Sequence, residues 1–141
     1  MSALRDDQVR RYSRHVLLPE LGGVGQKRLL AGAVALPGLD LAGQAAALYL
    51  AAAGVGRLVV GDVGPVVAPG PLFEAEDVGR PGKDAARARI AALNADCRVV
   101  DAADSAVPLP LADAGSDPVA ALGAGARAAR QVIRSIVGDV S

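Results

Sequence analysis

Side chains that could act as nucleophiles, acid–base catalysts or metal ligands are scarce in this 141-residue sequence, which has one cysteine and one histidine. The single Cys97 excludes an internal disulfide and any pair of closely spaced metal-binding thiols. Because Cys97 begins an apolar run, we expect it to behave as a small buried hydrophobic residue. His15 lies in a charged segment with no constellation of serine, cysteine or carboxylate residues that would argue for catalysis, so we expect a surface or packing role. We predict no metal site.

Two glycines, at positions 38 and 43, lie where a strand would turn into a helix, and the surrounding pattern predicts the elements that position them. The short apolar run from Ala33 to Leu36 is typical of a buried strand. The segment from Leu41 to Ala53 is strongly helical, and Gly54 is placed to cap it in a left-handed conformation. A second strand is predicted from Arg57 to Asp62. Together these elements form the start of a βαβ unit.

Helices and strands continue to alternate along the rest of the chain. Before the first strand we expect a polar helix at residues 5–15, followed by a glycine-rich turn and a short helix within 16–30. After the second strand we expect a loop from Val63 to Pro71, an amphipathic helix after Gly79 with Ala86, Ile90 and Leu93 on one face, and a strand from Cys97 to Val100. An irregular connection from Asp101 to Pro118, interrupted by the apolar Val107 to Leu111, then leads to a last helix from Ala124 to Val137. This order predicts one α/β domain over residues 1–141, with a helical arm at 1–32. Residues 33–141 are expected to form a Rossmann-like three-layer α/β/α half-domain with a mainly parallel sheet.

The composition excludes several classes of function. Fifteen basic and fifteen acidic residues give a formal charge of zero, so no overall field attracts nucleic acid or an anionic membrane. Tyr12, Tyr49 and Phe73 are the whole aromatic set, which disfavours nucleic-acid and sugar binding by ring stacking. The sequence begins without an apolar signal segment, and no apolar stretch is long enough to span a membrane. We therefore expect a soluble cytoplasmic protein.

Three segments resemble, in the same order, the MoeB/ThiF/HesA adenylyltransferases, which are relatives of the ubiquitin-activating enzymes. They are RYSRHVLLPELGGVGQKRLL at 11–30, AALYLAAAGVGRLVVGD at 46–62 and DVGRPGKDAARARIAALN at 77–94. The resemblance covers most of residues 4–100 and fades beyond Val100. Family members are much longer, so the resemblance identifies the chain as a truncated member. It implies chemistry in which ATP and magnesium adenylate the terminal carboxylate of a ubiquitin-like carrier protein, to which sulfur is later transferred.

The family's GxGGxG turn, where nucleotide phosphates approach backbone amides, is replaced here by Gly38-Leu39-Asp40-Leu41-Ala42-Gly43, which keeps the outer two glycines. Asp40 puts a negative charge where phosphates would lie, and two like charges at about 4 Å repel by about 4 kcal/mol at an effective dielectric of about 20. Pro37, just before the turn, removes a backbone donor. We therefore expect ATP binding to be weak at best. Gly38 and Gly43 could instead be retained for tight strand-to-helix packing.

The resemblance assigns Asp62 to the nucleotide ribose, although the residue could also cap a strand or helix. A second family carboxylate is replaced by Gly64, and the family's catalytic arginine segment is replaced by a shorter loop. The family lysine that directly follows GRP is displaced by one position to Lys83, a rotation of about 100° on a helix. The family's metal-binding aspartate falls near Ala124, and its four-thiolate zinc site cannot form with one cysteine. Lys83 is accordingly a weak candidate for catalysis, while Gly38, Gly43 and Asp62 form a weak residual nucleotide site.

Arg14 lies in the N-terminal segment, which retains the family pattern most fully. In the resembling enzymes this arginine reaches the ATP of the neighbouring subunit. An arginine can grip phosphate oxygens from outside a pocket, because its planar guanidinium stays charged at any working pH. Arg14 is therefore a candidate for action in trans, with a solvated surface arginine as the alternative.

We interpret the chain as a catalytically degenerate family member, more a partner module than an enzyme, with no cofactor required and at most weak binding of ATP and magnesium. Its expected partners are another copy of itself, an active ThiF/MoeB-like relative, and a ubiquitin-like carrier protein. One alternative is an active ATP-dependent adenylyltransferase of a carrier-protein terminus. Another is a small-molecule-binding accessory that reuses the scaffold.

Overall fold

Short strands alternate with helices along residues 22–111 and 117–138, the part of the chain that the computed structural model describes. The elements in chain order are α3 (Gly22–Ala31), β1 (Ala33–Leu36), α4 (Leu41–Ala53), β2 (Arg57–Val60), the 3-10 helix η1 (Ala75–Asp77), α5 (Gly82–Leu93), β3 (Arg98–Val100), β4 (Val107–Pro108) and α6 (Pro118–Val137). Most of the core strands and helices predicted from local pattern are present.

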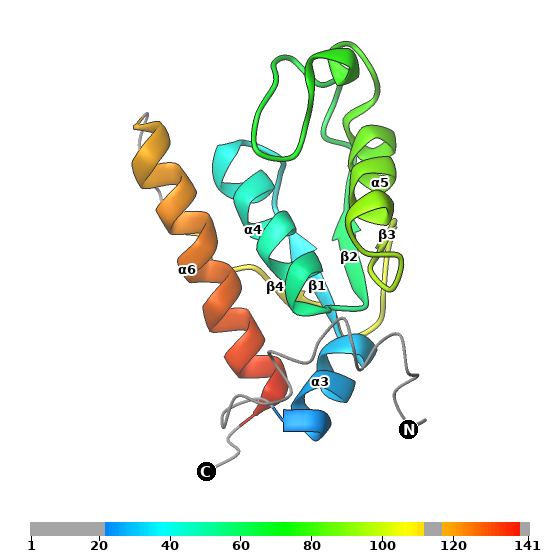
Figure 1. The fold of residues 1–141 in the computed structure, drawn as a ribbon, viewed down its shortest axis with the longest axis vertical. Coiled ribbons are helices and arrows are strands. Elements are labelled where there is room, and N and C mark those ends of the chain that lie inside the picture. Colours follow the sequence, from blue (N-terminus) through cyan, green and yellow to red (C-terminus); the bar gives the residue numbers. More distant parts are fainter. Residues whose placement is uncertain (1–21, 112–116, 139–141) are drawn as a thin grey trace.

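The four strands form one sheet in the order β3-β2-β1-β4, and every neighbouring pair is parallel (Figure 1). Parallel neighbours need crossover connections, and α4 and α5 supply them between β1 and β2 and between β2 and β3. β4 returns to the other side of β1, where Val34 is in register with Val107. The predicted α/β class, with a Rossmann-like parallel sheet, is therefore confirmed.

One face of the sheet carries the core. Alternate strand residues are buried on this face, which comprises Val34, Leu36, Leu58, Val60 and Val99. Helices α4, α5 and α6 lie on this side of the strands (Figure 1), and α4 contacts both of the other two. The described residues therefore supply the sheet and one helical layer, which are two of the three layers expected.

Helices α4 and α6 pack unusually closely because small residues line their contact. A Cβ added to Gly125 of α6 would overlap the carbonyl oxygen of Ala42 in α4. Ala46 of α4, together with Ala128 and Ala129 of α6, is almost fully buried. Side chains this small allow two backbones to approach until they touch, so α6 is held along the full length of α4.

The carboxyl end of α4 is satisfied by two buried amide side chains. Gly54 caps the helix at φ 98°, as predicted. Gln26 of α3 donates from Nε2 to the carbonyl oxygen of Ala53 at 2.8 Å, and Asn94 donates from Nδ2 to that of Ala51 at 2.8 Å. The first bond satisfies a carbonyl group that a helix end leaves without an intrahelical partner, and the second adds to the Gly54 amide that Ala51 already accepts. They also tie α3 and the end of α5 to the central helix.

Several predicted boundaries were wrong. The glycines at 22, 23 and 25, expected in a turn, lie within α3. The last helix begins at Pro118 rather than Ala124, because Asp117 caps it through the amide of Val119 and proline is well tolerated in a first helical turn. Leu93, expected on the apolar face of its helix, is half exposed. The polar helix expected at residues 5–15 lies outside the described residues.

None of the described helices is both long enough and apolar enough to cross a membrane. The longest, α6, carries arginines on its outer side and buried apolar residues on the other. Its apolar stripe is used in packing against α4 and α3.

Candidate functional site

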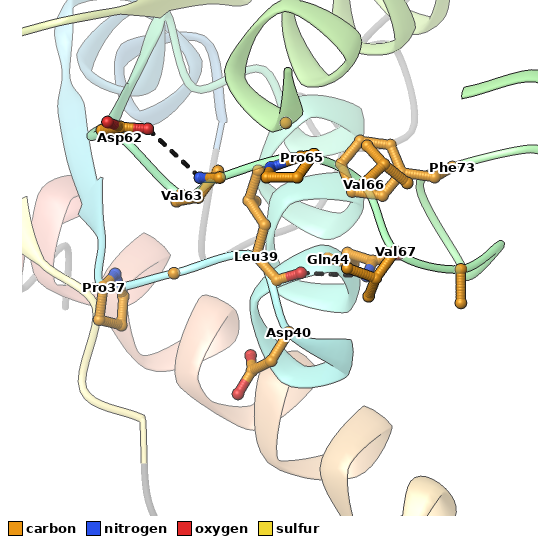
Figure 2. A pocket seen from close by; sticks show the side chains of 14 residues that line it. Pro37, Leu39, Asp40, Gln44, Asp62, Val63, Pro65, Val66, Val67 and Phe73 are labelled. Carbon is orange, nitrogen blue, oxygen red and sulfur yellow. Dashed lines mark hydrogen bonds between the residues drawn. The ribbon is translucent and has the colours of Figure 1, made fainter. Parts of the chain in front are cut away.

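A pocket of about 370 Å³ lies where β1 and β2 end, between the turn that enters α4 and the loop that follows β2 (Figure 2). In open α/β sheets, ligands usually bind just beyond the carboxyl ends of the parallel strands. Most of the lining is apolar or backbone, and its polar side chains are Asp40, Gln44 and Asp62. We call this hollow the turn pocket.

Asp40 closes the start of α4 with its own side chain. Its Oδ1 accepts a hydrogen bond from the backbone amide of Gly43 at 2.9 Å, the geometry of an N-cap. The positive end of a helix attracts anions through such free amides. Here one of those amides is engaged by a carboxylate within the chain, and the same carboxylate adds negative charge to the pocket wall.

The two retained glycines differ in what they do. A Cβ on Gly43 would overlap the carbonyl oxygen of Gly38, so the tight passage from strand to helix requires glycine at 43. A Cβ on Gly38 would meet nothing within 4 Å, and Gly38 lines the pocket. Tight packing between strand and helix therefore explains the glycine at 43, whereas the glycine at 38 leaves open space on the side of the pocket.

Gln44 is a pocket residue that the sequence analysis did not identify. Its Nε2 donates to the carbonyl oxygen of Leu39 at 3.1 Å, and its Oε1 accepts from the amide of Leu72 at 3.2 Å. These bonds join the turn before α4 to the loop after β2 (Figure 2 shows the first of them). Gly70 lies so close to Oε1 that a Cβ there would collide with it. A lone buried glutamine in an alanine-rich helix was the signal available in the sequence.

Asp62 lies just beyond the end of β2 and is exposed on the pocket rim. Its Oδ1 accepts from the amide of Gly64 at 3.3 Å, a local turn contact drawn in Figure 2. This long bond leaves the other carboxylate oxygen, Oδ2, without a hydrogen bond to the described residues. Asp62 thus combines a structural turn with a carboxylate available to a ligand.

Lys83 turns away from the pocket. Its Nζ lies 2.6 Å from Oδ1 of Asp101 at the end of β3, and the lysine is absent from the pocket lining although its neighbour Gly82 is present. The Lys83 ammonium group lowers the pKa of Asp101 by hydrogen bonding to its carboxylate and by charge attraction. The family lysine, displaced by one position to Lys83, therefore points toward the end of β3 and not into the pocket.

Arg89 holds the loop between β2 and α5 through a cluster of carboxylates. Its Nε lies 2.7 Å from Oδ2 of Asp77, and its Nη2 lies within 3.3 Å of both Glu74 and Glu76. Asp77 is fully buried and also accepts the amide of Glu74 and the guanidinium of Arg80. The Arg89 hydrogen bond lowers the pKa of Asp77, with support from the Glu74 amide. The basic residues nearest in sequence to the pocket loop are thus committed to structure.

The pocket lining contains two carboxylates and no lysine or arginine. Polyphosphate binding requires cationic groups that neutralise several negative charges. Within residues 22–111 and 117–138, no three histidine, cysteine, aspartate or glutamate side chains are grouped as a metal site would need. The residue set therefore fits ATP with magnesium poorly, although the open space at Gly38 and the carboxylate of Asp62 fit a smaller polar ligand.

Cys97 and the N-terminal candidates lie apart from this site. Cys97 is buried in the core, and burial raises the pKa of its thiol to about 12. Ala124, aligned with the family's metal-binding aspartate, lies within α6 and is buried. Arg14 and His15 lie outside the described residues.

Comparisons with known proteins agree on one family. The sequence model of the ThiF family matches residues 12–121. The sulfur carrier protein ThiS adenylyltransferase of Escherichia coli K12 is 39% identical over 100 residues, which are 68% of this chain and 40% of that protein. The probable adenylyltransferase/sulfurtransferase MoeZ of Mycobacterium tuberculosis is 41% identical over 102 residues, 70% of this chain and 26% of MoeZ. The chain thus spans well under half the length of these two curated relatives.

Solved structures show the same fold. The crystal structure of PaaA matches with a TM-score of 0.64 at 27% identity, covering 99% of this chain and 43% of PaaA. TcdA (CsdL) matches with a TM-score of 0.63 at 20% identity, covering 94% of this chain and 57% of TcdA. The second likeness concerns the fold alone.

Proposed function

This chain belongs to the ThiF family, and we propose that within it the chain is a catalytically degenerate module that works by associating with another protein. The family relatives it matches are named as adenylyltransferases, and the chain corresponds to a minor part of their length. The function proposed is therefore that of a partner, either of a second copy or of an active relative, with a ubiquitin-like carrier protein as a further possible component of the assembly.

The observation that carries this proposal is the charge of the turn pocket. Asp40 places its carboxylate on the Gly43 amide at the positive end of α4, and Asp62 adds a second negative charge at the rim. With no lysine or arginine in the lining, an incoming triphosphate meets repulsion and loses a helix-end amide. Weak or absent nucleotide binding follows, which argues for a role in association.

The alternative of an active adenylyltransferase requires a cation to enter the pocket. Lys83 is the candidate, because it begins α5 next to the pocket residue Gly82. It would first have to leave Asp101, which is largely exposed, and exposed ion pairs are weak enough to exchange. The family relatives' activity supports this alternative, and the two carboxylates oppose it.

A small-molecule accessory role is favoured by a different observation, the open space beside Gly38 within a pocket of about 370 Å³. Apolar walls with a few fixed polar groups are typical of small-ligand sites. Gln44 joins the two sides of this pocket through its hydrogen bonds to Leu39 and Leu72. A ligand of this pocket would be neutral or cationic, since both titratable lining groups are carboxylates.

Calorimetry with ATP and magnesium separates these functions. We expect a dissociation constant of about 1 mM or weaker for the natural chain. Asp40→Asn keeps the helix cap and removes the charge, so it should strengthen ATP binding by about fivefold or more. Asp84→Asn, an equal charge change on the outer side of α5, should have no effect. Micromolar binding by the natural chain would support the active enzyme and overturn the proposal.

A further inference from the structure

The face of the sheet opposite α4, α5 and α6 carries an apolar row across all four strands. Val100 is in register with Val59, Val59 with Ala35, and Ala35 with Pro108. Val100, Val59 and Ala35 are half-buried, and Pro108 is exposed. Most of their neighbours one position along each strand point to the other face and are buried, namely Val34, Leu36, Leu58, Val60 and Val99. We call the surface formed by Ala35, Val59, Val100 and Pro108, with Arg57 and Arg98 beside them, the open face.

The next row of the open face holds two arginines and, in register with Arg57, the buried Ala33. Arg57 and Arg98 are in register on neighbouring strands, two positions before Val59 and Val100, so their side chains leave the sheet on the same side. Arg57 donates to the carbonyl oxygen of Ala31 at 2.9 Å, and Arg98 is exposed. Neither arginine has a carboxylate partner among residues 22–111 and 117–138. Like charges directly opposite on a sheet repel, so this row favours an acidic neighbour.

Parallel sheets are normally covered by helices on both faces. In the described part of this chain, the helices that pack on the sheet lie on one face only (Figure 1). We propose that the open face docks an amphipathic helix of a partner protein, with apolar side chains on the Val59 row and acidic side chains on Arg57 and Arg98. The two rows lie about 7 Å apart along the strands, so one helix about 10 Å across covers both. This inference rests on the proposed function and names the surface that performs it.

An added strand is a poorer occupant than a helix. The amide of Leu109 donates to the carbonyl oxygen of Ala35, so position 108 directs its backbone away from β1 toward the free edge. Proline at 108 has no amide hydrogen to offer there. β4 is also only two residues long, and β3 at the other edge is three residues long and carries Arg98.

A second copy of the chain is also a poorer occupant. The longest described helix, α6, exposes three arginines on its outer side, Arg127, Arg130 and Arg134. These charges would repel Arg57 and Arg98. Helix α4 carries no charged residue at all, and α5 carries more basic than acidic residues. None of the helices within residues 22–111 and 117–138 offers an acidic face, so the charge of the open face favours a helix from a different protein.

Two synthetic helical peptides test the proposal with the natural chain. Both carry leucine at positions i, i+3, i+4 and i+7, and glutamate flanks the leucines in one peptide while lysine replaces it in the other. By fluorescence anisotropy we expect the glutamate peptide to bind at least tenfold more tightly. Arg98→Glu should reverse this preference, and Arg130→Glu on the outer side of α6 should leave it unchanged. Thermal melting should show that Arg98→Glu is no less stable, because it creates an opposite-charge pair with Arg57.

Equal binding of both peptides, or a preference that Arg98→Glu leaves intact, would overturn the open-face proposal. A dimer seen by light scattering and abolished by Arg98→Glu would also overturn it, by making a second copy the occupant. The calorimetry with ATP and magnesium tests the proposed function independently of these peptides. Tight ATP binding would contradict the proposed degenerate module. Equal binding of the two peptides, with no ATP binding in calorimetry, would contradict only the open-face proposal.

Discussion

Gly125 of α6 lies directly against the carbonyl oxygen of Ala42 in α4, so closely that a Cβ at position 125 would overlap that oxygen. The two helices are joined here backbone to backbone, and the contact has no flexible side chain that could yield. The position of α6 along α4 is consequently set by the absence of one methyl group.

Gly125→Ala should destabilise the fold by about 1–3 kcal/mol, because the added methyl forces the two helix backbones apart. Urea unfolding followed by circular dichroism measures the change. Gly123→Ala is the matched control, since its Cβ would meet only the far end of the Arg127 side chain at 3.1 Å. Alanine at 123 should be neutral or stabilising through helix propensity. Equal effects of the two substitutions would contradict the close contact.

Asp40 acts on stability through its cap and on ligand binding through its charge, and two substitutions separate these effects. Asp40→Ala removes the acceptor of the Gly43 amide and should cost about 1 kcal/mol of unfolding free energy. Asp40→Asn keeps an acceptor and should leave stability almost unchanged. If chemical unfolding finds both variants equally destabilised, the charge rather than the cap stabilises α4.

Gln44 should control the order of the loop above the turn pocket. Gln44→Ala leaves the part-buried carbonyl oxygen of Leu39 and the buried amide of Leu72 without their partner, and an unsatisfied buried amide costs about 1–3 kcal/mol. Hydrogen exchange at Leu72 should accelerate by at least tenfold. Gln131→Ala, on the exposed side of α6, is the control and should leave that exchange rate unchanged. Unaltered protection of Leu72 in Gln44→Ala would show that the loop is held by other contacts.

Cys97 predicts a loss of stability in alkali. Burial raises the pKa of its thiol from 9.0 to about 12, so the folded state holds its proton more firmly than the unfolded state. The stabilisation is complete below about pH 9 and is lost as the pH rises from about 9 to about 12. At pH 10 the loss of unfolding free energy should be about 1 kcal/mol. Cys97→Ala should show a smaller decrease between pH 8 and pH 10 in urea titrations, and an identical decrease would contradict the assignment.

The sequence predicted the elements that depend on local pattern. β1, α4 and its Gly54 cap were predicted at their observed bounds, because apolar runs and helix caps are read over a few residues. β4 was anticipated only as an apolar interruption at 107–111, since a two-residue strand has no period of its own and exists through its pairing with β1. Such pairing depends on residues far away in the chain.

The site was predictable in its charge and less so in its geometry. The negative charge of Asp40 and the displacement of Lys83 were evident from residue types and spacing. That the Asp40 carboxylate is engaged by Gly43, and that Lys83 reaches Asp101, depends on side-chain directions set by the tertiary structure. Gln44 escaped notice because its two partners lie on separate loops.

The pairing of β1 with β4 has a consequence for how the chain folds during synthesis. β1 can pair with β2 as soon as α4 has formed, because those strands are close in sequence, whereas its other edge waits for residues 107 and 108. Loop closure over a longer segment is slower, so the β1–α4–β2–α5–β3 unit should assemble first. Until β4 and α6 emerge from the ribosome, β1 exposes an unpaired edge and α4 exposes the small residues that later receive Gly125. The nascent chain should therefore need a holding chaperone most until residues 107–137 have been translated.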